Sequence, residues 1–351
     1  MRTDRNCEID LLRFIFSVCI VLYHISMNVS SSFCSMGAIS TDFFFIVCGM
    51  FLSKMRVTDR KKALGGSCKY VFIRFISIYP YYVVALSLKL LFYVVLESPS
   101  KEKVLVEIIR STPSLVFMDS FIGKGAIKIT GEWFLTVYFL SMFLCCLGTK
   151  LSDRFKTIYS GIIGLTISIV LSIKNGSVIL GVEYGVLTLV LRGLSLMLIG
   201  IWFASNHTLK DAFQLRQKGV SDKHLTLIKV VGYGVVVLYA FGGKNGFVSL
   251  LVDAILVICV TVTYHNPGVV LQGITSYMAK ISMIMFIIHS IVIYVCISIF
   301  GYMRSDTGIL NSFISSMIML GASILFSIIY YLLLSRLANA LKIKVIQCLK
   351  M

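Results

Sequence analysis

The chain has 351 residues, of which 58% are hydrophobic and only 14% are charged. Soluble domains are closer to half apolar and a quarter charged, so this composition excludes the ordinary soluble classes. The net charge is +17, but the sequence contains no soluble basic domain, which argues against nucleic-acid binding. The charge is better explained by basic cytoplasmic connections that contact anionic membrane lipids. The same charge could also help to collect a polyanionic cytosolic substrate.

Long apolar runs recur along the chain, most of them close to the length at which a helix crosses about 30 Å of hydrocarbon. They predict an all-α integral membrane protein, a polytopic bundle of about ten transmembrane helices. The expected spans are 11–28, 38–53, 75–96, 132–148, 157–173, 184–204, 225–242, 247–264, 281–300 and 309–336. We treat residues 1–351 as a single transmembrane domain and expect no appended soluble domain, because each polar connection is too short to fold alone.

Basic residues gather in alternate connections between these runs. The 54–74 connection holds seven of them: Lys54, Arg56, Arg60, Lys61, Lys62, Lys69 and Arg74. Others follow the fourth and sixth runs or lie in the tail: Lys150, Arg154, Lys156, Lys210, Arg216, Lys218, Lys223, Lys342, Lys344 and Lys350. Positive residues stay in the cytoplasm, so we predict that both chain ends are cytoplasmic, N-in and C-in. A signal peptide could mimic the first run, but this topology is explained better when that segment is retained.

The connection at 97–131 does not follow the pattern of alternating basic and nearly uncharged connections, because it is long and carries charges of both signs. Within it, the stretch 114–122 is apolar but too short to span the membrane. It could re-enter the membrane or lie on its surface, and the sequence leaves both arrangements open.

The first apolar run carries ionisable groups at depths that lipid tolerates poorly, which makes them functional candidates. His24 follows Arg13 by eleven residues, so on a helix both face one side and His24 lies about 16 Å deeper. Asp10 precedes Arg13 by three residues, within reach of a helical ion pair. This run therefore predicts a guanidinium at the cytosolic edge and an imidazole near mid-membrane.

The ninth run repeats the arrangement with a second histidine. His289 follows Lys280 by nine residues, which puts it about 13 Å from the cytosolic edge. Ser282 is seven residues before His289 and lies on the same helix face. His24 and His289 could then face one water-accessible cavity. The alternative for His289 is a hydrogen bond between helices, a common structural use of a membrane histidine.

Three further charged residues have both a functional and a structural interpretation. Arg192 and Asp253 are buried by position and could be each other's ion-pair partners. Arg74 could be an ordinary positive-inside residue at a helix end. The ten cysteines show no metal-ligand spacing, so we expect no metal site and interpret them as packing residues.

Six segments, in order along the chain, resemble the acyltransferase family 3 membrane proteins. The first joins a basic residue to a histidine across ten intervening residues, and the last runs from a serine to a histidine. The segments are EIDLLRFIFSVCIVLYH, STDFFFIVCGMFLSK, IRFISIYPYY, GEWFLTVYFL, LRGLSLMLIGIWFA and KISMIMFIIHSIV. Each match alone is weak because membrane helices share composition, but six in the correct order cover nearly the whole chain.

This resemblance implies a multi-pass O-acyltransferase of the bacterial inner membrane. Such an enzyme moves an acyl group, usually acetyl, from acetyl-CoA or another cytosolic acyl-CoA to a hydroxyl of a cell-surface polysaccharide sugar or its lipid-linked precursor. The acyl-CoA is a donor substrate, so no bound cofactor is implied. The protein would act alone or with separate glycan-assembly proteins. Two rival functions, a secondary transporter and a polysaccharide flippase or polymerase, would also bury charge but do not explain the six segments.

On this interpretation His24 is the general base, because neutral imidazole suits proton removal near neutral pH. An acetyl-His24 intermediate is the alternative. Arg13 would hold a donor phosphate or polarise the thioester carbonyl. We further assign two donor-binding residues and four residues of the substrate pocket: Arg74 and Arg192, and Glu132, Trp133, Ser282 and His289.

Overall fold

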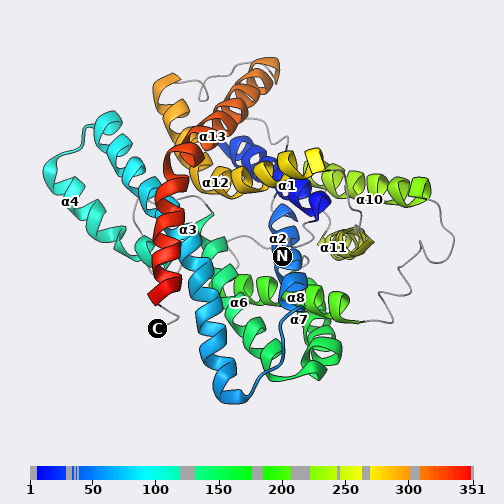
Figure 1. The fold of residues 1–351 in the computed structure, drawn as a ribbon. Coiled ribbons are helices and arrows are strands. Elements are labelled where there is room, and N and C mark those ends of the chain that lie inside the picture. Colours follow the sequence, from blue (N-terminus) through cyan, green and yellow to red (C-terminus); the bar gives the residue numbers. More distant parts are fainter. Residues whose placement is uncertain are drawn as a thin grey trace. The chain divides into compact units, whose positions relative to one another are not determined.

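A computed structural model describes residues 6–28, 34, 37, 39–118, 131–175, 185–206, 222–242, 246–262, 269–300 and 309–348. Over these residues the chain is helical and contains no strand (Figure 1). The helices are α1 (Cys7–Asn28), α2 (Ile39–Leu52), α3 (Arg60–Glu97), α4 (Lys101–Arg110), η1 (Thr112–Val116), α6 (Glu132–Leu151), η2 (Phe155–Tyr159), α7 (Ser160–Asn175), α8 (Val186–Ser205), α10 (Asp222–Gly242), α11 (Gly246–Val262), α12 (Val269–Phe300) and α13 (Ile309–Cys348). The predicted all-α class is confirmed.

Each predicted span overlaps a helix of the described chain, and seven stretches of that part of the chain are long and apolar enough to cross a membrane. Two shorter apolar helical stretches cover 39–52 and 226–239. These observations support a multi-pass membrane protein. The count of ten spans and the N-in, C-in orientation stay predictions.

Helix α3 is much longer than the span predicted at 75–96. It begins at Arg60 and has 38 residues, a length of about 57 Å that exceeds the hydrocarbon core. Most of the basic connection is therefore helical, because lysine and arginine are good helix formers and nothing at 60–74 ends the helix. Pro80 lies inside α3, as prolines of membrane helices often do.

The 97–131 connection begins with α4, which has no buried residue. Its N-cap is Ser100, whose side chain accepts a hydrogen bond from the Lys103 backbone. The pKa of Glu102 is lowered by its own backbone N–H and by the Ser100 hydroxyl. The 3-10 turn η1 follows and ends at Val116. Its C-cap is Phe117, whose ring packs edge-on against Tyr82. Residues 119–130 lie outside the described part of the chain.

The chain has two compact units, each built from three separate segments, and the single transmembrane domain stays a prediction. Unit 1 comprises Met1–Cys19, Cys34–Cys68 and Val137–Ala279, and unit 2 comprises Ile20–Phe33, Lys69–Thr136 and Lys280–Met351. Because the chain passes repeatedly from one unit to the other, α1, α3, α6 and α12 contribute residues to both.

In unit 1, α8 packs against both α2 and α7 (Figure 1). A glycine on each helix allows the backbones of α2 and α8 to approach closely. A Cβ at Gly49 would collide with the backbone carbonyl of Met197, and one at Gly200 would collide with that of Ile46. Membrane helices approach each other in this way through small residues, which bring the backbones into van der Waals contact. This close packing holds the helices that carry Asp42 and Arg192.

Candidate active site

Two histidine rings stack in unit 2. His24, near the end of α1, and His289, within α12, have ring centroids 5.0 Å apart and an interplanar angle of 28°. His289 is fully buried, whereas His24 is partly exposed. The structure therefore brings together the two histidines expected to share a cavity, with His24 as the accessible member.

The His289 ring is oriented by the backbone of its own helix. Its Nδ1 lies 2.8 Å from the Phe286 carbonyl oxygen and 3.1 Å from that of Met285. A carbonyl only accepts hydrogen bonds, so Nδ1 carries the proton and Nε2 presents a lone pair. Nε2 is buried and has no hydrogen-bond partner among the described residues. His289 can therefore accept a hydrogen bond from a group brought to this position.

The start of α6 packs against α12 beside this histidine. The Phe134 and Phe286 rings lie 5.1 Å apart, and Phe286 is 6.0 Å from His289. Gly131, directly before α6, has φ 89°, and a Cβ there would meet the Phe286 ring at 3.2 Å. A glycine is needed here both for the positive φ and for the close approach.

Three other predicted pocket residues also belong to unit 2. Glu132 and Ser282 are buried, and Trp133 is half-buried with its ring edge-on to Phe134 at 6.2 Å. Ser282 lies on α12 about two turns before His289. The sequence interpretation missed Phe286 as a site residue, although its spacing of three residues from His289 places it on the same helix face.

Arg13 lies on α1, the helix that also carries His24, as their spacing predicts. Its Nη1 is 3.9 Å from Asp10 Oδ1, which confirms the expected helical ion pair. The Arg13 side chain is partly exposed, with a relative accessibility of 30%, so its guanidinium stays available to a further anion.

Arg74 is exposed on α3. Its guanidinium lies over the Tyr70 ring, 5.3 Å from the centroid, and Nη2 donates to the Tyr70 hydroxyl at 3.3 Å. Arg74 is thereby held along its own helix, and its donor-binding role stays a prediction.

Arg192 lies in the core of unit 1, and its partner differs from the expected one. Its Nε is 2.9 Å and its Nη2 2.6 Å from Asp42 Oδ1, and Nη2 donates to Thr41 Oγ1 at 3.2 Å. Arg192 and Asp42 are fully buried. The structural interpretation of the sequence offered Asp253 as the partner of Arg192, but Asp42 is the direct partner and Asp253 is an electrostatic neighbour of both. This geometry favours the structural interpretation of Arg192; donor binding stays a prediction.

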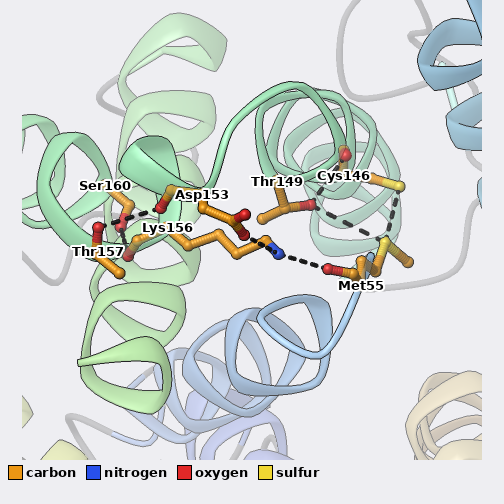
Figure 2. Close-up of polar contacts among 7 residues, drawn as sticks. All are labelled: Met55, Cys146, Thr149, Asp153, Lys156, Thr157 and Ser160. Carbon is orange, nitrogen blue, oxygen red and sulfur yellow. Dashed lines mark hydrogen bonds and ion pairs between the residues drawn. The ribbon is translucent and has the colours of Figure 1, made fainter. Parts of the chain in front are cut away.

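A buried lysine ties two connections of unit 1 together (Figure 2). Lys156 Nζ donates to the Met55 carbonyl oxygen at 2.6 Å and to Asp153 Oδ1 at 3.0 Å. Met55 follows α2, and Lys156 lies in the π-helical turn η2 before α7. Lys156, expected to be one of the basic cytoplasmic residues, is thus only 8% exposed and links the two connections.

No group of three or more His, Cys, Asp or Glu side chains that could hold a metal ion occurs within the described ranges. The model of a family described as an acyltransferase domain matches residues 6–332. Neither the curated proteins nor the solved structures contain a match to this chain.

Proposed function

The chain belongs to the family defined by that acyltransferase domain, and from this premise we propose that it is a membrane O-acyltransferase. It transfers an acetyl or related acyl group from a cytosolic acyl-CoA to a hydroxyl of a cell-surface polysaccharide sugar or of its lipid-linked precursor. The observation that carries the proposal is the histidine pair, in which a partly exposed His24 stacks on a buried His289 whose Nδ1 lies 2.8 Å from the Phe286 carbonyl oxygen.

His24 acts as the general base in the proposed reaction. A ring nitrogen takes the proton of the sugar hydroxyl while the hydroxyl oxygen forms a bond to the thioester carbonyl carbon. The carbon–sulfur bond then breaks, the ester is released, and the CoA thiolate regains a proton from the His24 imidazolium. In the alternative route the acyl group first bonds to a His24 nitrogen and then moves to the sugar oxygen.

His289 supports His24 in two ways. Its face lies against the His24 ring at 5.0 Å, so its π-system stabilises the imidazolium that forms during proton transfer. Its Nε2 lone pair accepts a hydrogen bond from the acceptor sugar, which positions the reacting hydroxyl. Because its Nδ1–H is held by backbone carbonyls, the ring needs little reorganisation when substrate binds.

The remaining candidate residues are assigned either to the acyl-CoA donor or to the acceptor sugar. Arg13 binds the acyl-CoA, because a guanidinium forms forked contacts to phosphate and polarises a carbonyl. Glu132, Trp133 and Ser282 line the acceptor pocket. Trp133 is half-buried, and its ring is suited to stack on the apolar face of a sugar.

Mass spectrometry of the surface glycans tests this function. A strain lacking the gene is complemented with the wild-type chain, with His24→Ala, or with His224→Ala as a matched control, since His224 is exposed on α10. We expect an ester-linked acyl group to disappear on deletion and to return with the wild type and the His224 variant only. Membrane levels of all variants are compared by immunoblot. An unchanged ester pattern after deletion would refute the proposed activity, and full restoration by His24→Ala would exclude His24 from the mechanism.

A further inference from the structure

We propose that the core of unit 1 holds a proton site, in which the Asp253 carboxyl group carries one bound proton and donates it in a hydrogen bond to Asp42. Three helices meet there: α2 carries Asp42, α8 carries Arg192 and α11 carries Asp253. The reaction proposed above uses neither Asp42 nor Asp253, so this inference does not depend on it.

The charges of the cluster do not balance without this proton. Arg192 supplies one positive charge, while Asp42 and Asp253 would supply two negative charges if both were ionised. Asp42 and Arg192 are 0% exposed and Asp253 is 4% exposed, so the surplus negative charge would lie buried. An uncompensated charge at such a position is costly, and burial favours its neutralisation. One proton makes the cluster neutral.

The hydrogen bonds identify the carboxyl group that holds the proton. Arg192 Nε and Nη2 both contact Asp42 Oδ1, which keeps Asp42 as the ionised partner of the guanidinium. Among the described residues, no donor reaches Asp42 Oδ2 or either oxygen of Asp253. The two carboxyl groups are nevertheless close enough to share a hydrogen bond. A proton on Asp253 supplies the missing donor, because a protonated carboxyl is both donor and acceptor.

No other described side chain that faces Asp253 supplies a positive charge that could replace the proton. Helix α11 packs against α2, α7, α8 and α10. From α10, Tyr239 lies close enough to interact electrostatically with Asp253, but a neutral phenol does not offset a negative charge. Over the described residues, α7 contributes no charged or titratable group to Asp253. The compensating charge must therefore come from a proton or from another small cation, and the hydrogen-bond arrangement favours the proton.

Infrared spectroscopy of the full-length protein in lipid nanodiscs tests the proposal directly. At neutral pH the wild type is expected to show the C=O stretching band of a protonated carboxyl group, and Asp253→Asn is expected to lack it. Asp59→Asn is the control, because the Asp59 side chain is 84% exposed and lies on the surface. A wild type without the band, or an Asp253→Asn protein that keeps it, would overturn the proposal.

Thermal unfolding supplies a second, independent readout. Asn resembles a protonated carboxyl in shape and can donate to Asp42, so Asp253→Asn is expected to unfold within about 2 °C of the wild type. Asp253→Leu cannot donate and is expected to unfold at a clearly lower temperature. If instead sodium or potassium ions stabilise the wild type and this effect is lost in Asp253→Asn, the cluster binds a metal cation and the proton assignment is wrong.

Discussion

The imidazole of His24 stacks on that of His289 at a centroid distance of 5.0 Å, although 264 residues separate them in the chain. One ring is partly exposed and the other is fully buried. The buried ring is fixed by the carbonyls of Met285 and Phe286. A pair in which one member is accessible and the other is immobilised can present a single reactive nitrogen in a defined orientation.

This pair gives the first prediction. We expect His289→Ala to lower the acyl-transfer rate by about 10- to 100-fold, less than the roughly 10²- to 10⁴-fold loss expected for removal of the general base in His24→Ala. His289→Asn is expected to recover part of the activity, because its amide can still donate to the α12 carbonyls. Turnover by purified protein in nanodiscs measures this. Equal loss in both His289 variants would mean that the aromatic ring itself is required.

The second prediction concerns the turn before α6. Gly131→Ala is expected to cost about 1–3 kcal/mol, because alanine is strained at φ 89° and its Cβ meets Phe286 at 3.2 Å. Gly185→Ala is the matched control, since Gly185 has φ 84° and nothing within 4 Å of a Cβ. The difference in unfolding temperature isolates the Phe286 contact. Because Phe286 touches His289, only Gly131→Ala should also reduce acyl transfer; a similar activity loss in both would argue against this coupling.

The positions of most helices and the depths of the two histidines could be predicted from the sequence, because both depend on local patterns. The stacking of the two rings depends on packing between distant segments. Apolar runs locate the spans, and depth along a helix puts His24 and His289 at comparable levels. The start of α3 at Arg60 was missed, since a helix that continues into water loses its apolar signal. The partner of Arg192 was also wrong. Asp42 lies 150 residues from Arg192 in the sequence. The spacing of residues within a helix does not predict which of two buried carboxylates pairs with the arginine.

The third prediction separates the structural and donor-binding interpretations of Arg192. Arg192→Met leaves Asp42 as a buried, unpaired charge and is expected to destabilise the protein by about 3–5 kcal/mol. The double variant Arg192→Met, Asp42→Leu removes both charges and should recover most of this stability. Unfolding in detergent compares wild type, both single variants and the double variant. A well-folded Arg192→Met protein with weakened acyl-CoA binding would instead support the donor role.

The last prediction concerns the lysine that joins the two connections of unit 1. Lys156→Met keeps the length of the aliphatic stem but removes the charged hydrogen bonds to the Met55 carbonyl and Asp153. Hydrogen bonds from a charged group contribute about 1.5–3 kcal/mol, and the Asp153 contact adds little because that side chain is 79% exposed. We therefore expect a loss of about 1–3 kcal/mol in unfolding free energy, with faster proteolysis near Met55. Lys62→Met serves as the control, since Lys62 is 80% exposed and its ion pair with Asp59 is on the surface. Equal stability of the two variants would show that Lys156 does not hold the connection after α2 against the turn before α7.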